Sequence, residues 1–151
     1  MNNHIFYMQQ AILEAKKAYE IMEVPIGAVI VKNGSIIGRG FNKKETQKNP
    51  ISHAEIEAIQ QACLNIHDWR LNNSTLYVTA EPCIMCAGAI LHARIDKVIF
   101  GVKEPKFGGI ISQDNIFDKS NLNHTVSYEY GILEDEISNI MKSFFKKLRN
   151  I

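Results

Sequence analysis

Two short motifs carry the side chains with the most distinctive chemistry. His53-Ala54-Glu55 places an imidazole two residues before a carboxylate, and Pro82-Cys83-Ile84-Met85-Cys86 puts two thiols three positions apart. Imidazole and thiolate are common Zn²⁺ ligands, and catalytic zinc sites keep three protein ligands and an open fourth position. His53, Cys83 and Cys86 would supply the three ligands, which leaves Glu55 available for proton transfer. The two motifs therefore predict a catalytic zinc site.

Other uses of these residues compete with that interpretation. Cys63 could complete a structural Cys₃His site, but a helix starting at His53 would separate the two residues by about 15 Å. His67 and His124 stay open as further ligands. A C-x-x-C pair at a helix start also occurs in thioredoxin-like redox sites. Neither a structural zinc site nor a redox dithiol needs a His-x-Glu motif upstream. The presence of that motif therefore favours catalytic zinc.

Glu55 has an alternative role of its own. Ser52-His53-Ala54-Glu55 matches a capping box, in which the serine and glutamate side chains satisfy the first amides of a helix. Taken alone, this interpretation is the simpler one. The chain also contains Pro82-Cys83-x-x-Cys86, and both motifs would lie at helix N-termini, where thiolates are stabilised. The presence of the two motifs together favours the metal site.

The elements that must position these residues follow from apolar periodicity and turn residues. Amphipathic helices are predicted over the first twenty residues, from Ser52 onward, from 83 to about 92, and over 137–148. Strands are predicted at 28–31, 35–40, 75–79, 97–101 and 124–130. Asn33-Gly34 indicates a hairpin between the first two strands. The segment 102–123 is expected to be a loop bordering the site, with a short helical turn.

This arrangement predicts an α/β sheet with helices on both faces. Alternating helices and strands favour parallel pairings beside the first hairpin. Ligands in such sheets bind outside the carboxyl ends of the strands, and Cys83 directly follows the strand 75–79.

Bulk properties limit the possible classes of protein. The chain has 151 residues, of which 46% are hydrophobic and 22% charged, so one domain spanning 1–151 is expected. It contains no run of apolar residues long enough for a membrane span, and we expect a cytoplasmic protein in which Cys63 stays unpaired. A net charge of +1 means that any RNA-binding surface must be a local patch.

Several segments together resemble the bacterial tRNA-specific adenosine deaminases, a branch of the cytidine deaminase-like superfamily with the H-x-E and P-C-x-x-C signature. The resemblance extends from about Tyr7 to Arg149. It is carried by residues 23–29 (Glu-Val-Pro-Ile-Gly-Ala-Val), Asn42, His53-Ala54-Glu55, residues 75–90, Asn123-His124 and Phe144-Phe145.

The resemblance implies a fold and an activity. The expected fold is a three-layer α/β/α cytidine deaminase-like arrangement, with a mixed five-stranded sheet and one zinc ion per subunit of a homodimer. The expected reaction converts adenosine to inosine at the wobble position of a tRNA anticodon, with Glu55 as the proton shuttle. The resemblance also implies that Asn42, Val29 and Ala54 contact the flipped base, although Asn42 is equally explained as a turn residue.

Contacts to RNA are implied at Glu104, Lys106, Asn123 and Phe144. Phe144 is equally well explained as a core residue of an amphipathic helix. The chain has Glu104 where the family usually has aspartate, and residues 107–112 are bulkier than the family's version. These departures leave the chemistry intact and change the expected RNA contacts.

Two competing functions use the same site. A deaminase of a free base or nucleoside, such as guanine or cytidine, would need the same zinc and glutamate. Basic and aromatic residues at 103–107 and 144–149 favour RNA over a small substrate. A non-catalytic zinc module would have no need of a carboxylate at Glu55.

Overall fold

Helices and strands alternate along the chain as the apolar patterns predict. The computed structural model describes residues 3–119, 121–122 and 124–151. The elements are α1 (His4–Glu20), β1 (Gly27–Lys32), β2 (Ser35–Phe41), α2 (Ala54–Ile66), β3 (Ser74–Ala80), α3 (Ile84–His92), β4 (Lys97–Val102), η1 (Ile116–Asp118), β5 (Ser127–Tyr130) and α4 (Glu134–Arg149). The 3₁₀ turn η1 lies in the predicted loop after β4. Within the described residues, no helix combines the length and apolar character that crossing a membrane requires.

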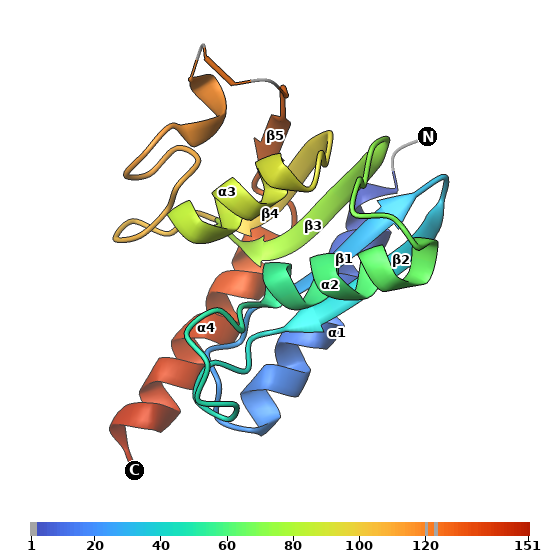
Figure 1. Cartoon of the computed structure of the whole chain (residues 1–151). Helices are drawn as coiled ribbons and strands as arrows, with labels where there is room; N and C mark the ends of the chain where they lie inside the picture. Colours follow the sequence, from blue (N-terminus) through green and yellow to red (C-terminus); the bar gives the residue numbers. More distant parts are fainter. Residues whose placement is uncertain (1–2, 120, 123) are drawn as a thin grey trace.

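The five strands form one mixed sheet in the order β2-β1-β3-β4-β5 (Figure 1). β1 pairs antiparallel with both β2 and β3, whereas β3, β4 and β5 run parallel. The predicted hairpin is confirmed: Asn33 and Gly34 have φ angles of 52° and 76°, which suit the tight turn between twisted strands. The parallel pairings bring the ends of β3 and β4 to the same edge.

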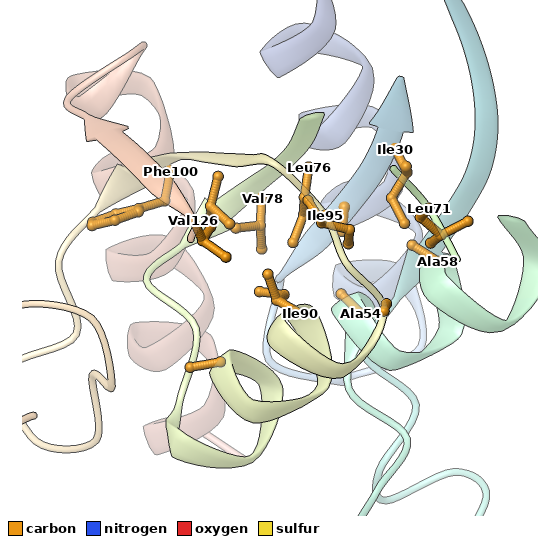
Figure 2. Packing of buried hydrophobic residues seen from close by; sticks show 14 of the residues in the cluster. Ile30, Ala54, Ala58, Leu71, Leu76, Val78, Ile90, Ile95, Phe100 and Val126 are labelled. Atoms are coloured by element: carbon orange, nitrogen blue, oxygen red, sulfur yellow. The ribbon is translucent and has the colours of Figure 1, made fainter. Parts of the chain in front are cut away.

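Alternate residues of the central strands supply two separate cores. On one face, Val29, Tyr77 and Ile99 pack with residues of α1 and with Ile137 of α4. On the other face, Ile30, Leu76, Val78 and Phe100 pack against α2 and α3. Figure 2 shows these sheet side chains above Ala54, Ala58 and Ile90. Since each face buries apolar side chains under helices, the predicted α/β/α layering is confirmed.

Helix α2 lies unusually close to β2 because small residues face each other. A Cβ atom on Gly38 would lie 2.3 Å from the Ala58 carbonyl oxygen, and one on Gly40 would lie 2.4 Å from the Ala54 carbonyl oxygen. Ala54, Ala58 and Ala62 are fully buried at this contact. The glycines therefore let the helix backbone approach the sheet, and this approach sets the position of the residues at the start of α2.

The last strand is shorter than predicted. β5 begins at Ser127 rather than at residue 124, and pairs with β4 from Lys97 to Phe100. Val126, which lies within the predicted strand, instead packs into the core on the α2 and α3 face. His124 Nε2 lies 2.9 Å from the Ile95 carbonyl oxygen, so a side chain connects this stretch to the sheet.

Candidate metal and catalytic site

Two helix N-termini bring the predicted ligands together. His53 is the N-cap residue of α2, and Cys83 is the N-cap residue of α3. Cys86 lies in the first turn of α3 and is fully buried, whereas His53 and Cys83 are partly buried. One nitrogen of His53 and the two sulfur atoms all lie within 4.8 Å of one another. These three side chains (the ligand cluster) are the three that the motifs predicted.

The ligand cluster has dimensions that suit Zn²⁺. His53 Nδ1 lies 3.7 Å from Cys83 Sγ and 3.5 Å from Cys86 Sγ. Tetrahedral zinc with ordinary Zn–S and Zn–N bonds would require these separations to be about 3.6 Å. Two sulfur donors and one imidazole are a donor set that zinc accepts, and three protein ligands leave the fourth position open. The residues present therefore fit the ion.

The pKa values of the two thiols are shifted in opposite directions, and Cys83 is the one favoured as a thiolate. A hydrogen bond from the Cys86 thiol, together with His53, lowers the pKa of Cys83 to about 4 although burial opposes the shift. The same hydrogen bond to Cys83 raises the pKa of Cys86, and burial adds to the rise. The hydrogen bond with Cys83 also raises the pKa of His53. A thiolate at Cys83 is the form that binds metal.

Glu55 lies in the first turn of α2, beside the ligand cluster but not part of it. It is 4% exposed. Burial raises the pKa of its carboxyl to about 7, and its own backbone amide offsets only part of the shift. A carboxyl group with a pKa near neutrality can both accept and release a proton at physiological pH.

The capping-box interpretation of Glu55 is not supported. The helix begins one residue later than a box would require, with His53 at the N-cap, and no side chain in the described part of the chain caps that position. Ser52 Oγ instead donates to Glu57 Oε2 at 3.0 Å. The Glu55 carboxyl instead has a hydrogen bond with the Cys86 thiol of the ligand cluster.

Sequence comparison places the chain in a known family. A family model described as MafB19-like deaminase matches residues 2–149. The tRNA-specific adenosine deaminase of Bacillus subtilis is 46% identical over 149 residues, covering 99% of this chain and 92% of that protein. The chain belongs to the tRNA-specific adenosine deaminase family. The family member from Aquifex aeolicus is 48% identical over 145 residues, covering 96% of this chain and 95% of that protein.

Solved structures agree with this membership of the tRNA-specific adenosine deaminase family. One, from a study of A-to-I editing by tRNA:A34 deaminases at the wobble position of transfer RNA, has a TM-score of 0.86 and 39% identity. The match covers 89% of this chain and 98% of that one. A guanine deaminase from Nitrosomonas europaea has a TM-score of 0.80 at 18% identity and covers 93% of this chain and 83% of its own, so that likeness concerns the fold alone.

The three residues that the family resemblance assigned to base binding lie in different environments. Ala54 is fully buried and directly follows His53. Val29 is also fully buried, but it packs on the sheet face that α1 covers. Asn42 donates from Nδ2 to the Val24 carbonyl oxygen at 3.3 Å and accepts from the Lys44 amide at 3.2 Å. Its side chain thus supports a turn, and base binding by Asn42 stays a prediction.

The residues that the family resemblance assigned to RNA are dispersed. Lys106 is exposed, and Glu104 Oε1 accepts a hydrogen bond from the Lys106 amide at 3.1 Å. Phe144 is 1% exposed, with its ring against Tyr19 and Phe145. Asn123 lies outside the described residues. Of the two adjacent phenylalanines, Phe145 is the exposed one, at 38%, and Phe144 occupies the core position that the alternative interpretation described.

Sequence reasoning missed one buried carboxylate beside the ligand cluster. Glu81 follows β3 and precedes Pro82-Cys83, and it is 4% exposed. Burial alone would raise its pKa, but hydrogen bonds from Ser112, Ile111 and Glu104 outweigh burial and hold the pKa of Glu81 below its usual range. The sequence did contain a signal for Glu81: it is an acidic residue between a predicted strand and the Pro82-Cys83 motif.

Proposed function

We propose that this protein deaminates adenosine to inosine hydrolytically at the wobble position of a tRNA anticodon. Water and adenosine are consumed, and inosine and ammonia are formed. The observation that carries the proposal is the buried carboxyl of Glu55 beside the ligand cluster, in a chain 46% to 48% identical to tRNA-specific adenosine deaminases. Residues 1–151 would act as one catalytic domain.

His53, Cys83 and Cys86 would hold one zinc ion per subunit. When bound, zinc lowers the pKa of a coordinated water toward about 7 and so supplies the nucleophile. Glu55 takes a proton from the water and delivers protons to the ring nitrogen and to the leaving amine of adenine. Burial of the Glu55 carboxyl favours its protonated form and so suits a group that must accept and donate a proton within one turnover.

The substrate class is supported by a basic groove beside the end of β4. The groove has a volume of about 460 Å³, and its cationic lining residues are Lys103, Lys142 and Arg149. Phe145 lines it as well and offers a ring for stacking. Residues 137–151 contain four cationic side chains and no acidic one, although the whole chain has a net charge of only +1. This local excess of positive charge suits RNA phosphates better than a free base.

We also infer a homodimer. Ile84 in the first turn of α3 is 57% exposed, and Ile51 just before α2 is 51% exposed. Ile84 thus belongs to one of the two helices that carry the ligand cluster and Ile51 precedes the other, and large exposed apolar side chains favour association. Light scattering coupled to size-exclusion chromatography tests this: a mass near 34 kDa, twice the 17.1 kDa chain, is expected.

The substrate is tested with a synthetic anticodon stem-loop that carries adenosine at the wobble position. Free adenosine, cytidine and guanine serve as parallel substrates, and a stem-loop with the adenosine moved by one position is the matched control. Inosine in the first RNA alone is the expected result. Ammonia from a free base or nucleoside, with the RNA unchanged, would overturn the substrate assignment and retain the deaminase chemistry.

The metal is tested by zinc analysis of Cys83→Ala. This variant is expected to lose both zinc and deamination, because a single imidazole and one thiolate bind the ion too weakly. Stoichiometric zinc in Cys83→Ala would show that the ligand set is different.

A further inference from the structure

Within the described part of the chain, all the donors to the Glu81 carboxylate come from one segment, residues 104–112. Oε1 accepts from the Glu104 amide at 3.0 Å and from the Ser112 hydroxyl. Oε2 accepts from three consecutive amides, those of Ile110 at 3.1 Å, Ile111 at 2.8 Å and Ser112 at 3.0 Å. Successive amides that converge in this way form a concave site for an anion. Glu81 supplies that anion from inside the protein.

The same segment, residues 104–112, lies directly on the turn that carries Cys83. The Gly109 amide donates to the Pro82 carbonyl oxygen at 2.8 Å, and Gly108 pairs with Cys83 as an isolated antiparallel bridge. A Cβ atom on Gly108 would lie 2.4 Å from the Glu81 carboxylate, and one on Gly109 would lie 2.8 Å from the Ile84 amide nitrogen. Only glycines therefore allow the segment to come this close.

The 104–112 segment also carries exposed side chains just before Gly108, the residue that pairs with Cys83. Lys106 is exposed, and Phe107 is 70% exposed. Glu104 connects Glu81 to Lys106. Its amide donates to the Glu81 carboxylate, and its own carboxylate accepts from the Lys106 amide. The position of Lys106 relative to Cys83 thus depends on the Glu81 carboxylate.

We propose that Glu81 is a positioning residue for RNA binding. Its carboxylate holds the 104–112 segment against the Cys83 turn, so that Lys106 and Phe107 meet the nucleotides flanking the edited adenosine at a fixed distance from Glu55. The identity of the ligand rests on the proposed function, whereas the restraint on the segment does not. Without the carboxylate, binding RNA would require the segment to be ordered first, at a cost in affinity.

Glu81→Gln is the main test, because the amide keeps the shape of the side chain but turns an NH₂ group toward backbone N–H donors. Hydrogen exchange is expected to accelerate at the amides of residues 104 and 110–112, and not in α1 or α2. In the zinc-loaded protein, KM for the anticodon stem-loop should rise about tenfold, while kcat changes less than about twofold. Zinc content should stay that of the wild type.

Two further variants separate positioning from a general loss of stability. Gly108→Ala pushes a Cβ atom into the carboxylate from the loop side and is expected to change exchange and KM in the same direction. Glu14→Gln is the matched control: Glu14 is also buried, at 2% exposed, but it pairs with Lys17 and Arg39. Glu14→Gln should leave exchange at 104–112 and KM unchanged.

Several results would overturn the proposal. Unchanged exchange at residues 104–112 in Glu81→Gln would show that the carboxylate does not hold the segment. Faster exchange with unchanged KM would limit Glu81 to a structural role. Loss of zinc together with a fall in kcat would assign Glu81 to the metal centre. If the wild-type protein leaves the stem-loop unmodified, the role in RNA binding falls with the proposed function, and the exchange data still decide whether Glu81 holds the segment.

Discussion

The start of α2 and the end of β3 each carry one glutamate that is almost inaccessible to solvent. Glu55 and Glu81 are both 4% exposed. Burial raises the pKa of Glu55 to about 7. At Glu81 burial acts in the same direction, but hydrogen bonds from Ser112 and from backbone amides hold its pKa below the usual range. The comparison teaches that donors aimed at a buried carboxylate can outweigh the effect of burial on its pKa.

The two environments suit different tasks. Glu55 lies beside the ligand cluster with a pKa at which protonated and ionised forms are both populated near neutrality. Glu81 receives hydrogen bonds on both oxygens from residues 104–112 and stays ionised. A proton carrier must change its charge within a turnover, whereas an anchor for a loop must keep it.

The largest expected effect is the loss of deaminase activity when Glu55 is replaced. Glu55→Gln should lower kcat by about 10²- to 10⁴-fold, because the amide cannot move a proton. Zinc content and the circular dichroism spectrum should match the wild type. The measurement is inosine formation in the stem-loop under single-turnover conditions. Near-normal turnover by zinc-loaded Glu55→Gln would contradict the assigned role.

The free energy of unfolding should depend more on Glu81 than on Glu55, the reverse of the order expected for activity. In chelator-treated protein, Glu81→Gln is expected to lower the free energy of unfolding by about 2 to 3 kcal/mol, since it removes charge-assisted hydrogen bonds. Glu55→Gln should leave the free energy unchanged or raise it, because it replaces a poorly solvated carboxyl with a neutral group. Urea unfolding at pH 7 measures both. Equal losses of unfolding free energy in the two variants would show that Glu81 and Glu55 do not differ in their contribution to stability.

The pH dependence of stability should also differ in sign. The folded-state pKa of Glu55 is raised from 4.5 to about 7, so its contribution to unfolding free energy declines as pH rises through that interval. The folded-state pKa of Glu81 is lowered from 4.5, so its contribution is present above that value and is lost as pH falls through the folded-state pKa. Each contribution is the difference between wild type and the Gln variant across pH, in chelator-treated protein. Slopes of the same sign would refute the assignment of opposite pKa shifts.

The smallest expected effect concerns one donor. Ser112→Ala removes the hydroxyl that bonds Glu81 Oε1 but keeps the Ser112 amide that bonds Oε2. The free energy of unfolding should fall by about 1 kcal/mol. Thermal or urea unfolding resolves a change of this size. A loss as large as that of Glu81→Gln would show that the amides contribute little.

Local sequence patterns predicted the features that depend on neighbouring residues. Asn33-Gly34 predicted the hairpin because positive φ angles at these positions are a property of the residues themselves. His53, Cys83 and Cys86 were grouped correctly because their chemistry and helix-start spacing are visible in short motifs. The parallel pairing of β3 and β4 followed from the helix between them.

The predictions that failed or stayed open depend on contacts outside the short motifs themselves. Ser52 was expected to cap α2, but its hydroxyl bonds Glu57 and Gln47. The 124–126 stretch alternates like a strand, yet Val126 enters the core instead of extending β5. Phe144 lies in the interior against Tyr19, a residue of the opposite end of the chain.

The amino-acid sequence by itself determined the family, the order of helices and strands, and the donor atoms of the ligand cluster, because these follow from residue type and short spacing. Only the tertiary structure decided how two glutamates of equally low solvent exposure differ. The donors that keep Glu81 ionised lie 23 to 31 positions away and reach it only because Gly108 and Gly109 let their segment pack on the Cys83 turn. Such a match between a carboxylate and a remote loop depends on three-dimensional packing, which no short stretch of sequence specifies.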